Sequence, residues 1–270
     1  MATPIGNLAD ISLRALHVLQ LVDAVACEDT RHTQALLRAY GIDARAWVAL
    51  HEHNEREASE GVIGRLRQGQ RVAYASDAGT PAVSDPGARL AAAVQQAGLR
   101  VVPLPGASSV TALLSVAGAA GEVSGFVFGG FLPNKASERD AAVQALAAEP
   151  RAVILLEAPH RIEALARSVA LLGDRRITVG RELTKQFEEV ATMPCGELAE
   201  WLGASPQRGR GEFALLLHPV EVAAQPGEGV RVLKLLLAEV PLKTAVKLAA
   251  EITGESRNAL YEEALKLKRE

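Results

Sequence analysis

The sequence predicts an α/β fold with a mainly parallel sheet, and three observations lead to that prediction. The chain has 270 residues, enough for two small α/β domains or for one domain with appendages. Apolar residues make up 49% of it and aromatic residues only 4%, a mixture typical of helices packed on a sheet. Short β-rich runs alternate with helical stretches along the chain, as they do in βαβ units.

The predicted strands are continuous apolar runs rather than alternating ones, as expected where both faces of a sheet are covered. They are Ala24–Cys27, Trp47–Leu50, Val72–Ala75, Val101–Leu104, Phe126–Phe128, Val153–Leu156, Ile177–Val179 and Glu212–Leu217. The predicted helices lie between them and carry apolar residues at helical spacing. They are Ile11–Val22, Thr30–Ala39, Glu55–Arg67, Gly87–Ala97, Ser108–Ala117, Ser137–Ala147, Arg161–Leu172 and Gly196–Leu202.

The last part of the chain has a different character. A seam between domains is predicted near Gly118–Ser124, and the composition of Val222–Gly229 is typical of a linker. Val230–Glu270 contains no strand candidate and is predicted to form about three helices, with breaks at Val240-Pro241 and Thr253-Gly254. Helix, glycine-containing turn and helix in this order are typical of a helix-turn-helix.

Composition excludes some classes of protein and says little about others. The net charge of −3 neither indicates nor excludes a nucleic acid, because a local basic cleft can lie on an acidic body. Cys27 and Cys195 show no CxxC spacing, so neither a disulfide framework nor a zinc site is expected. His51 and His53 alternate like a metal pair, but no further ligands accompany them, and no metal is expected. Without a membrane-length apolar run or a secretory signal, a cytoplasmic protein with no membrane partner is predicted.

Turns of small and polar residues follow three of the predicted strands. Ser76–Pro81 and Val83–Gly87 follow one strand, Pro105–Ser109 another, and Glu28–Arg31 a third. In an open α/β sheet, ligands lie outside the carboxyl ends of the strands, where glycine and helix N-termini let backbone N–H groups approach them. Each turn alone is also compatible with an ordinary turn. No GxxxxGK[ST] or GxGxxG motif is present, so a nucleotide-like ligand would need an unusual α/β binder.

Eight segments, in one order, carry a resemblance that covers nearly the whole chain. They are Ala2–Leu8, Glu28–Arg31, Ser76–Pro81, Val83–Gly87, Pro103–Ser109, Phe131–Lys135, Glu157–Arg161 and Arg181–Lys185. Together they resemble the bacterial ribosomal RNA small subunit methyltransferase I family, of the tetrapyrrole methylase-like superfamily. Single segments are weak signals, whereas all eight in order are specific.

The resemblance implies two α/β domains, residues 1–119 and 120–221, with a cofactor cleft between them and a helical extension at 228–270. It implies S-adenosylmethionine as cofactor and 2′-O-methylation of a cytidine in the decoding region of small-subunit rRNA. The implied partners are that rRNA, within the assembled small subunit, and a second copy in a homodimer. Two alternatives remain: a small-molecule methylase of the tetrapyrrole type, and a non-catalytic RNA-binding assembly factor. Whether the helical extension contacts RNA or packs on the body stays open.

By the same resemblance, the cofactor contacts lie in the matching turns and strand ends. The residues it implies are Ile5, Gly6, Asp77, Gly79, Thr80, Pro81, Val83, Ser108, Ser109, Leu156, Glu157, Gly211, Glu212 and Ala214. One departure affects Ile5. In the family an apolar strand precedes the Thr-Pro-Ile-Gly-Asn turn, whereas here only Met1 and Ala2 precede it, and a strand usually needs about five residues.

Methyl transfer to a 2′-hydroxyl is an in-line displacement, and a base or polarising contact can accelerate it by about 10²–10⁴-fold. The candidates for catalysis and phosphate binding are Glu28, Asp29, Arg31, Asp77, His160, Arg161 and Lys185. Each also has a structural interpretation, since acids stabilise a helix start, histidine can cap one, and arginine can simply be exposed. The changes Glu28→Ala, Asp77→Ala and Arg161→Ala are expected to lower turnover while leaving the fold intact.

Overall fold

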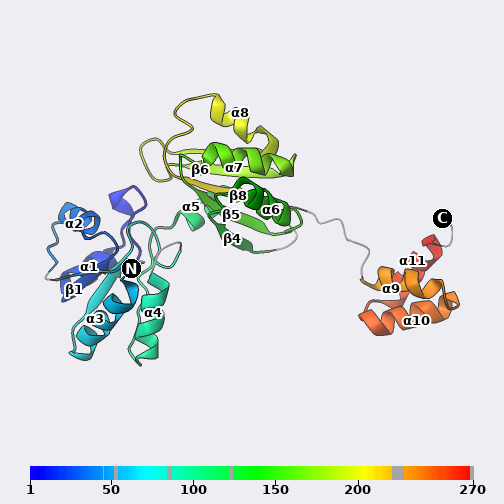
Figure 1. The fold of residues 1–270 in the computed structure, drawn as a ribbon, viewed down its shortest axis with the longest axis horizontal. Coiled ribbons are helices and arrows are strands. Elements are labelled where there is room, and N and C mark those ends of the chain that lie inside the picture. Colours follow the sequence, from blue (N-terminus) through cyan, green and yellow to red (C-terminus); the bar gives the residue numbers. More distant parts are fainter. Residues whose placement is uncertain (45, 52–53, 84–86, 122–123, 221–227, 268–270) are drawn as a thin grey trace. The chain divides into compact units, whose positions relative to one another are not determined.

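The computed structural model describes residues 1–44, 46–51, 54–83, 87–121, 124–220 and 228–267 (Figure 1). Its contacts divide the chain into Met1–Val220 and Glu221–Glu270, and each unit is described by itself. His53, the predicted turn at Ser84-Asp85-Pro86 and most of the predicted linker lie outside the described residues. No helix in the described part is long and apolar enough to cross a bilayer.

The first sheet is parallel, as predicted. It consists of β1 (Ala24–Cys27), β2 (Trp47–Ala49) and β3 (Val72–Ala75), in the order β2-β1-β3. All four residues of β1 are buried, because apolar side chains pack against both of its faces. The helices are α1 (Leu13–Leu21), α2 (Thr30–Ala39), α3 (Glu55–Arg67) and α4 (Gly87–Gln96), with the 3₁₀ turn η1 (Leu8–Asp10) before them.

Two apolar clusters cover the faces of this sheet. Val25 packs with Leu19 of α1 and Leu37 of α2, whereas Ala26, the next residue of β1, packs with Val62 of α3 and Leu90 of α4. Successive residues of a strand point to opposite faces, so each pair of helices covers one face. Figure 1 shows α3 and α4 side by side next to the sheet.

The prediction of a strand at Val101–Leu104 is wrong. Val101 and Val102 are 42% and 55% exposed, and the segment has no strand geometry. Pro103 has no N–H to donate to a sheet ladder. The segment's backbone link to the sheet region is a bond from the Ala2 N–H to the Leu104 carbonyl (3.1 Å). At the start of the Thr-Pro-Ile-Gly-Asn turn, Thr3 forms one isolated antiparallel bridge with Gly79 in place of a full strand.

The second sheet is mixed, so the prediction of a mainly parallel sheet is wrong for this part of the chain. Its order is β4-β5-β8-β6-β7, and only the pairing of β4 with β5 is parallel. The strands are β4 (Phe126–Gly130), β5 (Ala152–Glu157), β6 (Arg176–Arg181), β7 (Glu189–Pro194) and β8 (Phe213–Leu217). Strand β7 was not predicted. It follows β6 after a short connection, Glu182–Glu188, which allows only an antiparallel pair.

Helices cover the second sheet on both faces. On one face lie α6 (Ala136–Leu146), α7 (Ile162–Val169) and α8 (Leu198–Gly203), with the 3₁₀ turns η2 (Ala170–Leu172) and η3 (Cys195–Glu197). On the other face lies α5 (Ser109–Val116), whose Val110 and Leu113 pack on the sheet. Strand β8 is buried throughout, because alternate residues contribute to the two clusters.

In the unit Glu221–Glu270, the described residues 228–267 are helical, as predicted. It contains α9 (Glu228–Leu237), α10 (Leu242–Thr253) and α11 (Arg257–Leu267) around a small apolar core that includes Leu233, Ala249 and Leu260. The predicted breaks are confirmed. Pro241 precedes α10, and Gly254 ends it in the left-handed conformation (φ +75°) that glycine adopts without strain.

Candidate functional site

A cavity of about 380 Å³ lies between loops next to the first sheet and the ends of strands β5, β6 and β8 of the second sheet. Its size is within the range of small-molecule sites, and most of its lining is apolar. Both halves of Met1–Val220 contribute side chains. The lining residues are Ile5, Ala78, Gly79, Thr80, Val83, Ser108, Ser109, Phe131, Leu156, Glu157, Ala158, Pro159, Gly180, Leu183, Glu212, Phe213 and Ala214.

The first wall is the N-terminal turn joined to the loop after β3. Thr3 and Gly79 exchange backbone hydrogen bonds in both directions (3.0 and 3.1 Å), and the Thr3 hydroxyl donates to the Ser76 carbonyl. Gly79 has a φ of +78°, and a Cβ there would lie 3.3 Å from Cγ2 of Ile5. Glycine is therefore required both for the backbone conformation and for the close approach of Ile5.

The second wall contains the start of α5. Ser108 is the N-cap of this helix and makes no side-chain capping bond, and Ser109 begins the helix. The Thr80 hydroxyl donates to the Ala107 carbonyl (3.0 Å), which ties the loop after β3 to this helix start. N–H groups at a helix start have no partner within the helix and carry partial positive charge. This wall can bind a carboxylate or another anion.

The floor is the end of β5, where a buried carboxylate is only partly satisfied. Glu157 is 3% exposed, and its Oε1 accepts from the Ala158 N–H (2.9 Å) and pairs with Nε of Arg161 (3.1 Å). The Arg161 guanidinium also donates to the Leu132 carbonyl. Oε2 of Glu157 has no hydrogen-bond partner in the described part of the protein. A buried oxygen without a partner is costly, and this one is enclosed by protein atoms and does not face the open cavity.

The third wall is the connection between β6 and β7. Nζ of Lys185 contacts Oε1 of Glu182 (2.8 Å) and Oε2 of Glu212 (3.0 Å). Burial alone would raise the pKa of Glu182, but the bonds from Lys185 and from the Glu212 N–H hold it below its usual value. Burial opposes the charge of Lys185 as well, and the two carboxylates raise its pKa. Lys185 is therefore a charged group already committed to two partners.

The predicted acids after β1 and β3 lie together beside the first wall. The Asp29 N–H donates to Oδ1 of Asp77 (3.2 Å), and Asp29 itself caps α2 by accepting from the Arg31 N–H (2.8 Å). This cap bond is the main cause that lowers the pKa of Asp29. Glu28 is exposed, and the Arg31 side chain is 91% exposed near Asp29. Burial raises the pKa of the neighbouring Cys27 thiol, so it is no nucleophile here.

Most of the residues predicted to bind a cofactor lie on the cavity wall. Ten of the fourteen line it: Ile5, Gly79, Thr80, Val83, Ser108, Ser109, Leu156, Glu157, Glu212 and Ala214. The other four, Gly6, Asp77, Pro81 and Gly211, do not line the cavity but are each adjacent in sequence to a residue that does. Gly6 has a packing role, since a Cβ there would lie 2.3 Å from Cγ of Lys185.

None of the seven residues predicted for catalysis lines the cavity itself. Asp77 is next to the lining residue Ala78, and His160 is exposed directly after the lining residue Pro159. Arg161 and Lys185 are engaged in the ion pairs described above, which differs from the predicted role of free phosphate clamps. Among the described residues, no group of three or more His, Cys, Asp or Glu side chains could hold a metal ion.

Sequence reasoning missed seven lining residues: Ala78, Phe131, Ala158, Pro159, Gly180, Leu183 and Phe213. All except Gly180 and Phe213 lie inside segments that carry the family resemblance, and Phe213 lies between two predicted contacts. Gly180 had no local signal. It is the second-to-last residue of β6, and a Cβ there would lie 2.9 Å from a methyl of Leu113 and 3.0 Å from one of Leu183.

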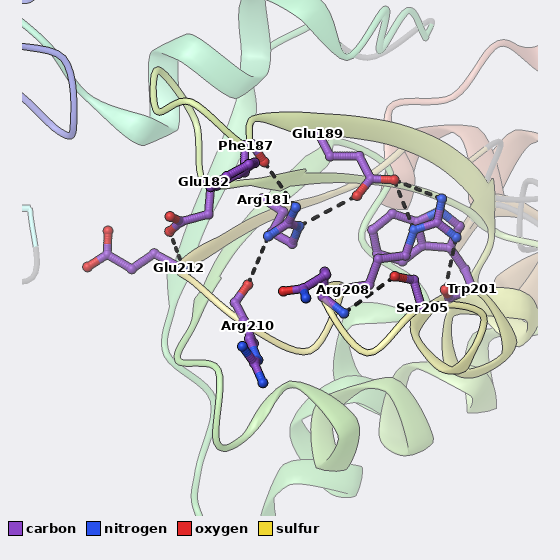
Figure 2. A network of polar contacts seen from close by, with 10 residues as sticks. Arg181, Glu182, Phe187, Glu189, Trp201, Ser205, Arg208, Arg210 and Glu212 are labelled. Atoms are coloured by element: carbon purple, nitrogen blue, oxygen red, sulfur yellow. Dashed lines mark hydrogen bonds and ion pairs between the residues drawn. The ribbon is translucent and has the colours of Figure 1, made fainter.

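A network of polar contacts links the end of β6 to the β6–β7 connection and to the segment that precedes β8 (Figure 2). The buried Arg181 donates to the carbonyls of Phe187 (3.0 Å) and Arg210 (3.3 Å) and lies 3.5 Å from the Glu189 carboxylate. Glu189 also pairs with Arg208 (2.8 Å), whose guanidinium lies over the Trp201 ring at 4.4 Å. Arg181 is thus hydrogen-bonded to both chain segments that flank the third wall. It contacts the β6–β7 connection at Phe187 and the segment before β8 at Arg210.

Comparison with known proteins covers almost all of the chain. Residues 2–199 match the model of the tetrapyrrole (corrin/porphyrin) methylases, and residues 223–268 match the RsmI C-terminal HTH domain. The ribosomal RNA small subunit methyltransferase I of Escherichia coli O157:H7 is 47% identical over 97% of this chain and 92% of its own length. That of Pseudomonas aeruginosa is 48% identical over 98% and 95%.

Solved structures show the same fold at low identity. Diphthine synthase superposes with a TM-score of 0.60 at 17% identity, covering 80% of this chain and 87% of that one. The cobalamin biosynthetic enzyme cobalt precorrin-4 methyltransferase gives 0.59 at 17% identity, covering 80% and 92%. With the family model over most of its length and relatives near 47% identity, the chain belongs to the ribosomal RNA small subunit methyltransferase I family of the tetrapyrrole methylases.

Proposed function

We propose that the protein transfers a methyl group from S-adenosylmethionine to the 2′-hydroxyl of a cytidine in the decoding region of small-subunit rRNA. The observation that carries the proposal is the cavity, with the strand end Leu156-Glu157 at its floor and the start of α5 in its wall. The relatives near 47% identity are each named a ribosomal RNA small subunit methyltransferase I, and these names support small-subunit rRNA as the methyl acceptor.

The residues present fit this cofactor. Its carboxylate matches the N–H groups and hydroxyls at Ser108 and Ser109, because a helix start favours an anion. The adenine ring matches the apolar wall of Ile5 and Leu183. When bound, the group supplies an electrophilic methyl on a sulfonium centre.

The chain's own contribution to the chemistry is alignment and proton handling. Holding two reactants in line can supply on the order of 7–11 kcal/mol of the barrier. Among the predicted acids, we propose Asp77 as the group that contacts the acceptor hydroxyl, because it is next to the lining residue Ala78. Glu28, Asp29 and His160 are the further candidates, and Arg31 is the cation we propose for the RNA, since its side chain is 91% exposed.

The two alternatives make different demands on this site. A tetrapyrrole-type methylase would share the cofactor wall, but the solved corrin and porphyrin enzymes are only 16–18% identical to this chain. That likeness supports the fold alone. A non-catalytic assembly factor would not need a donor cavity, so the cavity of about 380 Å³ argues against it.

The test uses the donor carrying a radiolabelled methyl group, with small ribosomal subunits, free rRNA and a porphyrin precursor as acceptors. We expect label in the rRNA of the subunits, at a 2′-hydroxyl, and none in the porphyrin. Asp77→Asn should lower turnover, whereas Asp174→Asn, an exposed acid outside the cavity lining, should not. Label in the porphyrin alone would contradict rRNA as the acceptor. A protein that binds no methyl donor in calorimetry would contradict the proposed methyltransferase activity.

We propose in addition that the protein acts in the cytoplasm as a homodimer, with domains at residues 1–119, 120–221 and 228–270. The family resemblance supports the dimer, and the exposed Phe126 and Phe128 on the edge strand β4 (39% each) are compatible with a covered surface. Sedimentation velocity of the purified protein should give twice the chain's mass of 28.5 kDa. A single monomeric species across the micromolar range would contradict the dimer.

A further inference from the structure

The mouth of the cavity is marked by the lining residues that are exposed to solvent. They are Ala78, Phe131, Pro159 and Glu212, whereas the other lining residues are buried or half-buried. Asp77, which is proposed above to contact the acceptor hydroxyl, is adjacent in sequence to the first of them. A nucleotide within a large RNA reaches the donor only from this side, because the walls and the floor are protein. The exposed lining residues are therefore the candidates for contacts with the acceptor.

Phe131 is the aromatic member of this exposed group. Its exposed fraction is 50%, whereas Phe213, the other aromatic residue of the lining, is 3% exposed. An aromatic side chain stabilises a fold most when it is fully buried, so part of that gain is lost at Phe131. Single exposed apolar residues are common on protein surfaces, but this one lies at the entrance that the acceptor must use. Its ring is available to the face of an unpaired base.

The backbone on both sides of Phe131 is fixed within the second sheet. Before it, Gly130 pairs with Leu155 of β5, and the register of the two strands shifts between Phe128 and Gly130. A shift of this kind turns the neighbouring side chains away from the regular alternation of the strand. After it, the Leu132 side chain packs in the apolar core of the sheet. The direction of the Phe131 side chain is thus set by residues that cannot easily move.

Two arginines hold the loop that follows. The Arg161 guanidinium donates to the Leu132 carbonyl, and the Arg139 guanidinium donates to the Asn134 carbonyl (3.0 Å). Arg139 is itself 8% exposed, and its Nε donates to the Ser168 hydroxyl (2.9 Å). The loop that carries the exposed ring is therefore anchored to α6 and α7 at two carbonyls. A ring on an anchored backbone loses little conformational entropy when a ligand packs on it.

We propose that Phe131 is a stacking platform for the unpaired base of the acceptor nucleotide at the mouth of the donor cavity. The inference rests on the proposed function and adds to it the residue that recognises the acceptor. Proteins that bind single-stranded RNA stack its bases on aromatic side chains, and every base has a π-face that can take part. The stack orients the nucleotide while Asp77 contacts its 2′-hydroxyl. Phe131 thus serves acceptor binding, and donor affinity does not depend on it.

The test uses three substitutions of Phe131, with small ribosomal subunits as the acceptor. Phe131→Ala should lower kcat/KM for the subunits by about 5–150-fold, the factor that corresponds to one lost stack. Phe131→Leu keeps an apolar side chain but has no ring, so its kcat/KM should be closer to that of Phe131→Ala than to that of the unchanged protein. Phe131→Tyr keeps the ring and should stay within about threefold. In calorimetry, all three variants should bind S-adenosylhomocysteine within about twofold of the unchanged protein.

A second measurement requires no methyl transfer. With S-adenosylhomocysteine in excess, filter binding of the subunits should be weaker for Phe131→Ala by a similar factor. The matched control is Leu171→Ala, at an apolar residue of the same unit that is 55% exposed and does not line the cavity. It should change subunit binding by less than about twofold. Thermal unfolding and sedimentation velocity check that each variant is folded and has the mass of the unchanged protein.

Each outcome decides the role of Phe131. Unchanged subunit kinetics and binding for Phe131→Ala, or equal losses for Leu171→Ala, overturn the stacking role. Weaker binding of S-adenosylhomocysteine that Phe131→Leu restores assigns the ring to the donor wall instead, and a changed mass in sedimentation assigns it to a contact between copies. If the unchanged protein transfers no methyl group to the subunits, the proposed function itself fails, which is a result that no Phe131 variant can produce.

Discussion

The ion pair at the cavity floor makes Arg161→Met a demanding test of the structure. Glu157 is 3% exposed and the Arg161 side chain 20%, and Nε of the arginine lies 3.1 Å from Oε1 of the glutamate. Methionine keeps most of the apolar stem but removes the charge and every donor. Glu157 would then retain only the Ala158 N–H, and the Leu132 carbonyl would lose its donor.

The magnitude follows from the burial of the pair. At 3.1 Å and an effective dielectric constant of about 20, the gross attraction is about 5 kcal/mol. Removing one partner of a buried pair typically costs about 3–5 kcal/mol, because the remaining charge stays desolvated. For a domain of this size, about 1 kcal/mol lowers the Tm by about 2–4 °C, so the expected fall is about 6–20 °C. Sequence alone predicted that a change at Arg161 leaves the fold intact, and the structure predicts otherwise.

The measurement is the free energy of unfolding from urea titration, with a double-mutant cycle. Glu157→Gln combined with Arg161→Met should be more stable than the sum of the two single effects predicts, by about 1–3 kcal/mol, since both buried charges are then gone. Arg167→Met, at an exposed arginine of the same helix, should stay within about 0.5 kcal/mol of the unchanged protein. A loss below about 1 kcal/mol for Arg161→Met, or additive effects in the cycle, would refute the reasoning.

Three further predictions concern other parts of the same unit. Gly79→Ala should cost about 1–2 kcal/mol of stability and weaken donor binding in calorimetry, because its φ is +78° and the new Cβ would meet Ile5 at 3.3 Å. Burial raises the pKa of Cys195 from 9.0 to about 11, so the stability that the neutral buried thiol contributes is present below pH 9 and lost as pH rises to about 11; over that window the free energy of unfolding of Cys195→Ala, from urea titration, should fall by about 3 kcal/mol less than that of the unchanged protein. Arg208→Lys should lower stability by about 1 kcal/mol and change the fluorescence of Trp201, since a lysine loses the planar stacking at 4.4 Å; unchanged emission would contradict the contact.

Local patterns were sufficient to predict most elements of the fold. The predicted β1 and β3 agree with the structure at both ends, and α2 and α3 do as well, because their apolar spacing and their caps are local signals. Asp29, for instance, was identified at the start of a helix, and it caps α2. The turns after β1 and β3 were found because glycine, proline and aspartate mark such positions in the sequence.

Pairing between distant segments was not predictable in the same way. Strand β7 reads Glu-Val-Ala-Thr-Met-Pro, and the sequence did not mark it as a strand; its six residues pair with β6 along its whole length. Val101–Leu104 has the composition of a strand but lacks a neighbour with which to form a ladder. The order β5-β8-β6, which makes the second sheet largely antiparallel, depends on the whole chain.

For the candidate site, too, local features were predictable and contacts between distant segments were not. Its turns could be predicted from the sequence, whereas the ion pairs of its charged residues could not. Lys185 and Arg161 were candidates for binding phosphate, and each has a carboxylate partner because the fold brings Glu182, Glu212 or Glu157 beside it. Two of these contacts, Glu157 with Arg161 and Glu182 with Lys185, are local in sequence, but the burial of Glu157 and the approach of Glu212 to Lys185 depend on the packing of the whole unit.

Strand β8 lies at the centre of the second sheet, hydrogen-bonded to β5 on one side and to β6 on the other. Its five residues are all buried, so no local opening exposes their amides to water. In deuterium exchange, these amides should therefore be replaced only when the whole unit unfolds. Phe213 and Ala214 belong to the cavity as well. One boundary of the proposed donor site is thus among the slowest-exchanging parts of the protein, and it persists unchanged between one catalytic cycle and the next.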